Sequence, residues 1–583
     1  MTKIEKINVD YNKIPLIEYP KPLLKRDSYF SLNGDWELCI TKDPKNIEFT
    51  RHCIVPYAIE SPLSGVNHLL DADEYLIYKK HVVLPLKFIK EHLILHFEGV
   101  DQICDVYINN YKVGSHIGGY TKFSFNIENF VATNEFDIFV VVKDESDTSF
   151  RSIGKQKLKR GGIFYTTTSG IYKPVWLESV GKEYIKDIIY TTLYDKRCLR
   201  IRIDATIDGT CKVKVDNQEF FMNTNQETLI KPEKFIPWDL NNPYLYKVEI
   251  EFLDDKVESY FAFRKIEIKT ASDGFKRLYL NDKPIFIKGL LDQGYYFLGN
   301  LTPRTYDDYF NEIKNLKELG YNTIRKHIKT EIDLFYYYCD KLGMLVIQDF
   351  VNGGEKVSKK ATFLPGLIPY YKGKKDNKFY KVYGRNNAQS QTEWINESKI
   401  IQKELYNHPS IIIYTIFNEG WGQFDSAKNY SRFKENDPTR FYDTTSGWID
   451  FGASDFLSIH NYFYKNKIHK DRFNLDRPQF LSEYGGYGLY LKDHFYGRKP
   501  FGYRRYKTCE ELTKHFASLH NDYIIPLIEK GLMGTIYTQV SDVEDEINGI
   551  YTFDRKVLKI DANTIKEINA KIDNLYEDIK WFF

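Results

Sequence analysis

The run SIIIYTIFNE (residues 410–419) decides the fold of the C-terminal half of this chain. It is short, continuous, apolar and rich in β-branched residues, which is consistent with a buried strand. The run ends in Asn418 and Glu419 and is broken by Gly420. The carboxylate of Glu419 is therefore either a solvated turn residue or a group that points into a pocket, and the neighbouring segments distinguish these alternatives.

The chain after Thr270 alternates between strand-like runs and helical patterns such as those of residues 305–320 and 330–343. Eight such strands predict a (β/α)8, or TIM, barrel over residues 271–583. The predicted strands are residues 284–291, 322–327, 344–350, 410–419, 440–447, 456–463, 479–486 and 532–539. Because active sites of this fold lie at the C-terminal ends of the strands, Glu419 becomes a candidate site residue.

A second carboxylate occupies the equivalent position on another predicted strand. Glu483 ends the apolar run QFLSEYGG (residues 479–486) just before two glycines. Two carboxylates across a barrel mouth are the groups that glycoside hydrolysis requires, one as general acid/base and one as nucleophile. Asn418 adds an amide that can hold a sugar hydroxyl. Either glutamate alone is explained as a solvated turn residue, but the pair favours catalysis.

The first half of the chain consists of short predicted strands separated by turn signals. Residues 1–180 show this spacing without a long helical period, which predicts an antiparallel β-sandwich. Residues 181–270 continue the pattern in smaller pieces, and their length suits an immunoglobulin-like β-sandwich. A length of 583 residues agrees with a multidomain chain of about three domains.

The composition excludes several classes of function. The formal charge of +2 gives no basic signal for nucleic acid. The seven cysteines are scattered without a CxxC pair, so we expect reduced thiols rather than a disulfide framework. No apolar run approaches the roughly 18 residues of a membrane helix, and the N-terminus has no signal-peptide pattern. We expect a cytoplasmic protein that binds neither nucleic acid nor membrane.

Short motifs lie in a specific order along nearly the whole chain. They are LNGDWEL (32–38), VPYAIESPLSG (55–65), SGIYKPVWLE (169–178), IPWDLNNPYLY (236–246), FRKIEIK (263–269), LNDKPIFIKG (280–289), ELGYNTIRKH (318–327), NHPSIIIYTIFNE (407–419) and FLSEYGG (480–486). Together they resemble glycoside hydrolase family 2, which contains β-galactosidases, β-glucuronidases and β-mannosidases. The first three motifs are similar to its sugar-binding-like jelly-roll domain, the next two to its immunoglobulin-like domain and the last four to its TIM barrel.

The resemblance implies a retaining glycosidase in which Glu419 is the acid/base and Glu483 is the nucleophile. Retention requires the two carboxyl groups to lie about 5–5.5 Å apart. The acid/base also needs a raised pKa, which partial burial and the negative charge of its partner can supply. Family members commonly carry an arginine near the nucleophile at the position of Arg325. The alternative for this arginine is a structural ion pair with Asp349.

Further strand-end residues are candidates for substrate binding. Besides Asn418 and Arg325, they are Asp292, Trp421, Trp448, His460, Asn461, Tyr462 and Tyr484. We expect the histidine and the asparagine to bind sugar hydroxyls. The two tyrosines are expected to hydrogen-bond Glu483 or to line the pocket. Each tryptophan either stacks on a sugar face or packs under a loop.

An acidic cluster, residues 544–546, follows the eighth predicted strand at a position where a cation could bind. We interpret it as a solvated turn. Some family members use magnesium, but no residues here have recognisable metal-ligand spacing, and retaining hydrolysis needs no metal. We therefore predict no metal site and no required cofactor.

Departures from better-known family members limit the choice of sugar. RKHIKTE (325–331) replaces the RxSHxP pattern of the lactase-like and glucuronidase-like branches. The segment after strand eight lacks the NxK clamp that glucuronidases use for the sugar carboxylate, unless lysines of the loop 353–387 replace it. We predict an exo-β-glycosidase of the β-galactosidase-like bacterial branch that acts on an oligosaccharide or glycoside. The alternative functions are a β-glucuronidase or galacturonidase, a β-mannosidase, an arabinosidase and a non-catalytic carbohydrate-binding protein. The sequence leaves open whether the protein forms a homo-oligomer.

Overall fold

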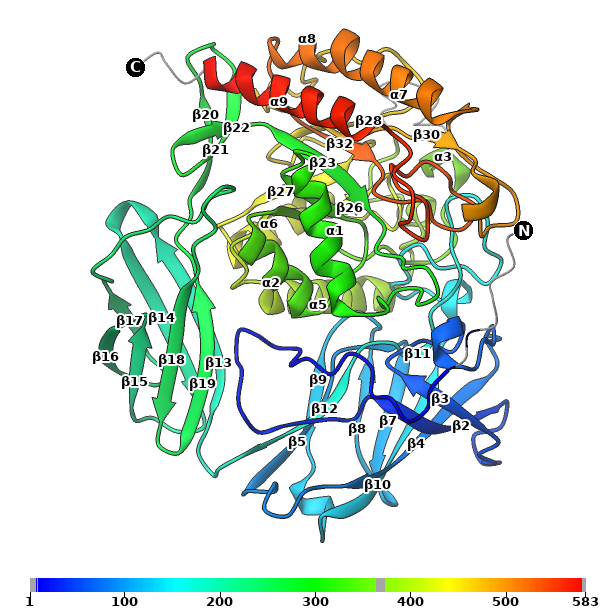
Figure 1. Cartoon of the computed structure of the whole chain (residues 1–583), viewed down its shortest axis with the longest axis vertical. Coiled ribbons are helices and arrows are strands. Elements are labelled where there is room, and N and C mark those ends of the chain that lie inside the picture. The colour runs from blue at the N-terminus through cyan, green and yellow to red at the C-terminus, as the bar shows by residue number, and fades with distance from the viewer. Residues whose placement is uncertain (1–6, 8, 363–372, 579–583) are drawn as a thin grey trace.

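The computed structural model describes residues 7, 9–362 and 373–578 and contains three parts (Figure 1). A β-sandwich drawn in blue to cyan and a smaller one drawn in cyan to green both lie against a barrel built from the second half of the chain. The predicted fold class of two β-sandwiches followed by a TIM barrel is confirmed. The domain boundaries at residues 180 and 270 stay predictions.

Two antiparallel sheets form the first sandwich, in the orders β3-β2-β4-β10-β7-β8 and β1-β12-β5-β9. The strands are β1 (Tyr29–Ser31), β2 (Gly34–Thr41), β3 (Arg51–Val55), β4 (Tyr75–Val83), β5 (His92–Phe97), β7 (Ile103–Ile108), β8 (Tyr111–Ile117), β9 (Phe123–Asn126), β10 (Glu135–Lys143) and β12 (Val175–Val180), beside the pair β6 (Val100–Asp101) and β11 (Gly170–Ile171). In β10, buried Phe136, Ile138 and Val140 alternate with less buried residues. One face of this sheet therefore packs on the sandwich core.

The second sandwich pairs a three-stranded sheet, β13-β14-β17, with a four-stranded sheet, β16-β15-β18-β19. Its strands are β13 (Ile185–Leu193), β14 (Cys198–Ala205), β15 (Thr210–Val215), β16 (Gln218–Asn223), β17 (Glu227–Ile230), β18 (Tyr246–Phe252) and β19 (Asp255–Phe261), followed by the connecting sheet β20 (Ile266–Thr270), β21 (Lys276–Leu280) and β22 (Lys283–Ile285). Buried Arg26 joins the two sandwiches, because it donates to Glu178 of the first (2.7 Å) and to Asp255 of the second (2.7 Å).

Eight parallel strands form the barrel sheet, in the order β27-β26-β25-β24-β23-β32-β29-β28. They are β23 (Ile287–Asp292), β24 (Thr323–Lys326), β25 (Leu345–Asp349), β26 (Ile411–Asn418), β27 (Phe441–Ser446), β28 (Leu457–Asn461), β29 (Gln479–Gly485) and β32 (Leu532–Thr538). Every predicted barrel strand is present. Within the described residues no backbone ladder joins β27 to β28, and side chains bridge this seam, as where Ser458 Oγ donates to Asp443 Oδ2 (2.8 Å).

Helices follow six of the eight barrel strands. They are α1 (Tyr306–Glu318), α2 (Asp333–Leu342), α3 (Lys359–Thr362), α5 (Ala388–Glu404), α6 (Ser426–Asn436), α7 (Cys509–Ser518), α8 (Ile525–Ile528) and α9 (Ala562–Asp578). The prediction of eight complete β/α units was wrong for β27 and β28, since residues 447–456 and 462–478 contain no helix. The first of these connections is shorter than the dozen or more residues that a helical crossover needs. Across the described ranges, none of the helices combines the length and apolar character that a membrane crossing requires.

Apolar and polar residues separate along the barrel strands. Ile287, Leu345, Phe480 and Met533, which lie near the starts of their strands, pack with Trp238 in one buried cluster. The starts of the strands therefore form a closed apolar base, while the strand ends carry the charged groups described below. The lysine-rich loop of residues 353–387 includes residues 363–372, which lie outside the described residues.

Candidate active site

Strand β26 ends in a turn that places Glu419 at the barrel mouth. Glu419 has a φ of +51°, and Gly420 follows with a φ of +77°. Glycine adopts this left-handed region at no steric cost, so Gly420 lets the chain turn as the strand ends. The Glu419 N–H donates to the Ser446 carbonyl of β27 (3.0 Å). The Glu419 side chain is only 13% exposed, so it is not a solvated turn residue.

The two candidate catalytic carboxylates lie close together. One oxygen of Glu419, one oxygen of Glu483 and one ring nitrogen of His460 all lie within 4.8 Å of one another. Retaining glycosidases hold their carboxyl groups about 5–5.5 Å apart, whereas inverting enzymes need about 6.5–9.5 Å to admit a water. The separation therefore fits a covalent double displacement. The same three residues are also a group that could ligate a metal ion, and the expectation that none is required stays a prediction.

Arg325, at the end of β24, uses all of its N–H donors inside the site. Nε and Nη2 donate to the two carboxylate oxygens of Asp349 (both 3.0 Å), and Nη1 donates to the Ser482 carbonyl (3.0 Å). The remaining donors reach Glu483 Oε1 (3.1 Å) and Asn418 Oδ1 (2.8 Å). Arg325 was expected either to contact the nucleophile or to form a structural ion pair with Asp349. It does both, because its planar guanidinium binds Asp349 and Glu483 at the same time. Because the oxygen of Asn418 accepts from Arg325, its amide group is held in place at the strand end.

Tyr462 contacts the second oxygen of Glu483. Its hydroxyl donates to Glu483 Oε2 (2.5 Å) and lies 2.9 Å from the Thr538 hydroxyl of β32. Its ring stacks on Tyr503, with centroids 3.9 Å apart and an interplanar angle of 5°. Tyr503 lies in the loop between β29 and α7, where no periodic pattern marks a pocket residue. Sequence reasoning therefore missed it.

His460 contacts the candidate acid/base. Its Nδ1 lies 2.8 Å from Glu419 Oε1, and its Nε2 lies 3.0 Å from the Ser446 hydroxyl and 3.5 Å from Glu483 Oε1. Burial lowers the pKa of His460 to about 3, so the ring is neutral at physiological pH. We expected a sugar contact here, but both ring nitrogens face protein groups, so the histidine orients Glu419.

The environment of Glu419 suits a general acid. Burial raises the pKa of this carboxyl above its ordinary value, and the nearby Lys155, His327 and Arg325 oppose the shift. The raised pKa favours the protonated form that must donate to a leaving group. Glu483, by contrast, accepts hydrogen bonds from Arg325 and Tyr462, which fix the direction of its carboxylate.

Tyr484 does not reach the site, which corrects one prediction. Successive side chains of a strand point to opposite faces, so Glu483 faces the barrel axis and Tyr484 faces outward. The Tyr484 hydroxyl lies 2.7 Å from His520 Nε2, which belongs to the helical segment after α7. The predicted hydrogen bond from Tyr484 to Glu483 was therefore wrong.

Asp292 and Asn461 are also engaged away from the catalytic pair. Asp292 forms a buried ion pair with Lys326, its register partner on β24. Lys326 follows Arg325 on this strand, so its side chain points away from the barrel axis while that of Arg325 points toward it. Asn461 donates to the Tyr464 carbonyl (3.0 Å) and so holds the loop after β28. The structure therefore gives both residues roles in positioning the mouth rather than sugar contacts.

The two tryptophans lie on different walls of the mouth. Trp421 stacks on Phe164 of the first sandwich, with centroids 4.9 Å apart. Its buried indole nitrogen has no hydrogen-bond partner in the described part of the chain, which leaves a donor for a ligand. Trp448 meets the His460 ring edge-on at 6.0 Å and lines a cavity of about 380 Å³ together with Tyr462.

The acidic cluster after β32 is buried, so its interpretation as a solvated turn was wrong. Glu544 pairs with Arg160 (2.7 Å), and Glu546 accepts hydrogen bonds from Tyr165 and from Asn548 (2.9 Å). Arg160 and Tyr165 belong to the first sandwich domain, which covers this loop. The sequence does not predict this burial, because a single sequence does not show which distant segment packs on a loop.

Comparison with known proteins gives the family. Residues 66–180 match the sugar binding domain of glycosyl hydrolases family 2, and residues 272–490 match the TIM barrel domain of the same family. A putative beta-glucuronidase of Formosa agariphila is 24% identical over 454 residues, covering 70% of this chain and 50% of that protein. A beta-galactosidase of Thermoanaerobacterium thermosulfurigenes is 27% identical over 490 residues, covering 77% of this chain and 61% of that protein. The chain thus spans about half the length of the curated relatives it matches.

Solved structures agree on the fold. A beta-glucuronidase of an uncultured Clostridium superimposes with a TM-score of 0.74 at 18% identity, covering 96% of this chain and all 100% of that one. A GH2 beta-galacturonidase of Eisenbergiella tayi bound to galacturonate superimposes with a TM-score of 0.70 at 18% identity, covering 96% of this chain and 99% of that one. At such identities the likeness carries the fold alone. With two models of one family matching in the expected order, this chain belongs to glycosyl hydrolases family 2.

Proposed function

We propose that this protein is a retaining exo-β-glycosidase that removes a terminal sugar from an oligosaccharide or glycoside. The observation that carries the proposal is the approach of Glu419 and Glu483 to within 4.8 Å at the ends of β26 and β29. Their environments differ as the two catalytic roles require, since one carboxyl has a raised pKa and the other is held by a guanidinium and a phenol.

In the first step, the Glu483 carboxylate attacks the anomeric carbon of the bound sugar. The bond between that carbon and the aglycone oxygen breaks, and this oxygen takes the proton of Glu419. The sugar is then joined to Glu483 through an ester, and Glu419 is ionised. Arg325 and Tyr462 aim the nucleophile by holding one of its oxygens each.

In the second step, Glu419 acts as the base. It takes a proton from a water molecule, the water oxygen attacks the anomeric carbon, and the ester bond to Glu483 breaks. The sugar leaves with its original anomeric configuration, and both glutamates return to their starting protonation states. His460 keeps Glu419 in place through both steps, since its ring stays neutral and contacts the carboxyl at 2.8 Å.

The terminal sugar belongs to the galactoside or the uronide group. The sequence motifs favour a β-galactoside, whereas the similar proteins include named beta-galactosidases, beta-glucuronidases and beta-galacturonidases. Specificity among such sugars depends on a few contacts to hydroxyl epimers and to the substituent at C6. A cytoplasmic location and the lack of a required metal are expectations that accompany this proposal.

The experiment that tests the proposal is trapping of the covalent intermediate. An activated fluorinated sugar should form an adduct that mass spectrometry locates on the peptide containing Glu483. Release of product with retained configuration, followed by NMR, should accompany it. Absence of an adduct and of turnover with galactoside, glucoside, glucuronide, galacturonide and mannoside probes would favour a non-catalytic carbohydrate-binding protein.

A further inference from the structure

A segment of the first sandwich domain reaches the barrel mouth. Residues 150–168, called here the N-terminal hairpin, fold back on themselves: the Lys157 N–H donates to the Tyr165 carbonyl, and the Tyr165 N–H donates to the Lys155 carbonyl (both 3.0 Å). The hairpin follows β10 in the sequence and precedes β11, so it is an excursion from the sandwich. Its position brings side chains of one domain to the strand ends of another.

The N-terminal hairpin is docked on loops that follow three different barrel strands. The Ile153 N–H donates to the Asn352 carbonyl after β25 (2.9 Å). Phe164 stacks on Trp421 after β26. Thr166 donates through its backbone N–H to Glu544 after β32 (3.1 Å). Contacts on three sides hold the hairpin at the mouth rather than at its edge.

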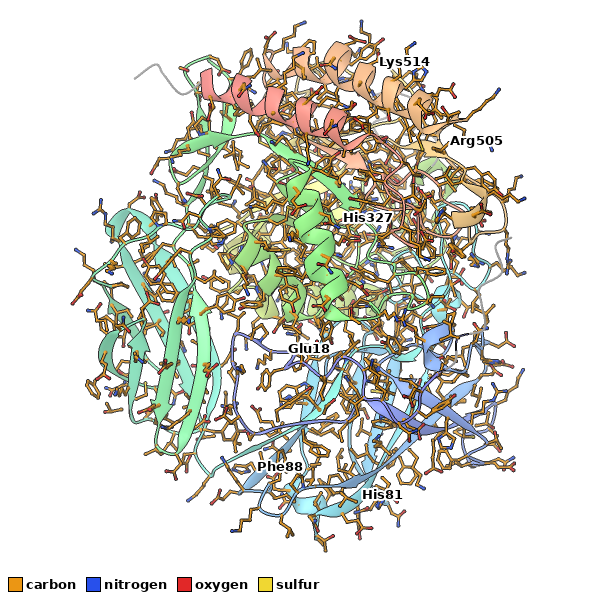
Figure 2. All side chains as sticks on the ribbon, in the orientation of Figure 1. Glu18, His81, Phe88, His327, Arg505 and Lys514 are labelled. Atoms are coloured by element: carbon orange, nitrogen blue, oxygen red, sulfur yellow. The ribbon has the colours of Figure 1, made fainter. Side chains whose placement is uncertain are left out.

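Lys155 is the half-buried cation that this hairpin brings to the mouth. Its charge lowers the pKa values of Glu419, His327 and Glu546, which follow β26, β24 and β32. His327 lies within the barrel part of the molecule (Figure 2). Lys155 is therefore near groups from three strand ends that surround the catalytic pair.

The ammonium of Lys155 has no ion pair or hydrogen bond with residues 7, 9–362 or 373–578. Three other cations of the hairpin are engaged: Arg151 pairs with Glu393 (3.1 Å), Arg160 pairs with Glu544 (2.7 Å), and Lys157 lies 3.6 Å from the centroid of the Phe164 ring. Lys155 thus differs from its neighbours in being held near the mouth by the hairpin backbone while its charged end is left without a partner.

The charged groups around Lys155 leave its ammonium available to an anionic ligand. Glu483 pairs with Arg325 and Glu544 pairs with Arg160. Burial raises the pKa values of Glu419 and Glu546, which favours their neutral forms. A partly buried cation that has no ion-pair partner of its own is best satisfied by a charge-assisted hydrogen bond to an anionic ligand.

We propose that Lys155 binds a carboxylate carried by the terminal sugar of the substrate, so that the N-terminal domain completes the active site. The substrate class is a β-glycoside of a hexuronic acid. This inference rests on the proposed function, because it places the sugar between Glu419 and Glu483. Lys155 then binds the sugar carboxylate, as the NxK clamp after the eighth strand does in glucuronidases. The lysines of residues 353–387 are not needed for this contact.

The test uses two pairs of aryl glycosides that differ only at C6: β-galactoside with β-galacturonide, and β-glucoside with β-glucuronide. We expect the wild-type protein to prefer the uronide in at least one pair. Lys155→Met should reduce that preference, measured as the ratio of kcat/KM values, by about 10- to 100-fold, mainly through KM. Lys155→Arg should retain more of the preference, because it keeps the charge. Lys159→Met, which changes an exposed lysine on the same hairpin, should match the wild type.

Two results would overturn the inference while leaving the proposed function intact. One is a wild-type preference for the neutral sugar in both pairs. The other is an equal loss of kcat/KM on both members of a pair in Lys155→Met, which would assign the lysine to balancing Glu419 or Glu546. In either case a glycosyl adduct on Glu483 would still form with a neutral sugar. Absence of both turnover and adduct with all four sugars would remove the proposed function and this inference together.

Discussion

The two sides of the barrel mouth are built differently. On the side of β24, β25 and β26, Arg325, Asp349 and Asn418 form one buried network that strands hold in place. On the side of β27 and β28 no helix follows either strand in residues 447–456 and 462–478, and a cavity of about 380 Å³ opens between loops. The catalytic geometry is therefore set by rigid strands, while the surroundings of the substrate are set by loops and by the N-terminal hairpin.

The largest expected effect lies on the strand side. Glu483→Gln should lower turnover by about 10³-fold or more, because an amide cannot attack the anomeric carbon. The variant should keep its thermal unfolding midpoint, since glutamine keeps the shape of the side chain, its amide oxygen still accepts from Arg325, and its NH2 group donates to the Tyr462 hydroxyl. Activity measured per folded molecule checks this. Turnover equal to that of the wild type would end the assignment of the nucleophile.

Arg325→Lys should have the next largest effect. A single ammonium cannot replace five N–H donors in a planar fork, so Asp349, Glu483 and Asn418 cannot all be held. Loss of the charge-assisted bonds to Glu483 predicts a fall in kcat of about 10- to 100-fold. Kinetics and thermal unfolding should be measured together. A lowered unfolding midpoint with unchanged turnover per folded molecule would show that the arginine only stabilises the barrel.

Tyr462→Phe should cost about 10-fold in kcat, because Glu483 loses one hydrogen bond that aims it. The matched control is Tyr484→Phe, which removes the hydroxyl of an outward-facing tyrosine near the same strand ends and breaks bonds to His520 and Thr535 but none to Glu483. The control should change kcat less than about twofold and unfolding free energy by about 1 kcal/mol. Equal kinetic losses in the two variants would contradict the alternation of β29.

The fourth prediction concerns pH and His460. The neutral His460 ring carries one proton, and we expect it on Nδ1, which lies 2.8 Å from Glu419 Oε1, rather than on Nε2, which lies 3.5 Å from Glu483 Oε1; Nδ1 then donates to Glu419. This bond favours ionised Glu419, so His460→Phe should raise the pKa of Glu419 and move the basic limb of the kcat/KM profile to higher pH by up to about one unit. A shift to lower pH would mean that Glu419 donates to the histidine instead.

The raised pKa of Glu419 also has a consequence for stability. Because the folded state binds this proton more tightly than the unfolded state, Glu419 contributes stability that is fully present below its ordinary pKa and is lost as pH rises through the folded value. Glu419→Gln removes this dependence. We therefore expect the variant to lose less stability than the wild type between acidic and neutral pH, as measured by chemical unfolding at matched pH values.

The sequence by itself determined the barrel strands and the candidate catalytic pair. Apolar runs of the right length predict strands, and polar residues that interrupt such runs mark the ends where this fold holds its chemistry. All eight barrel strands, Glu419, Glu483 and Arg325 follow from these local patterns. The order of short motifs along the chain then gave the resemblance that the family models confirm.

Only the tertiary structure decided which strand-end residues face the site and which distant segment covers it. Tyr462 and Tyr484 look alike in the sequence, but Tyr462, just after β28, meets Glu483, whereas Tyr484 follows Glu483 on β29 and so leaves that strand on the opposite face and meets His520. Lys155 and Arg160 carry no sequence signal for contact with the barrel, although Arg160 pairs with Glu544, which is 544 − 160 = 384 residues later. Their positions depend on the packing of one domain against another, and that packing follows from long-range contacts rather than from any local pattern.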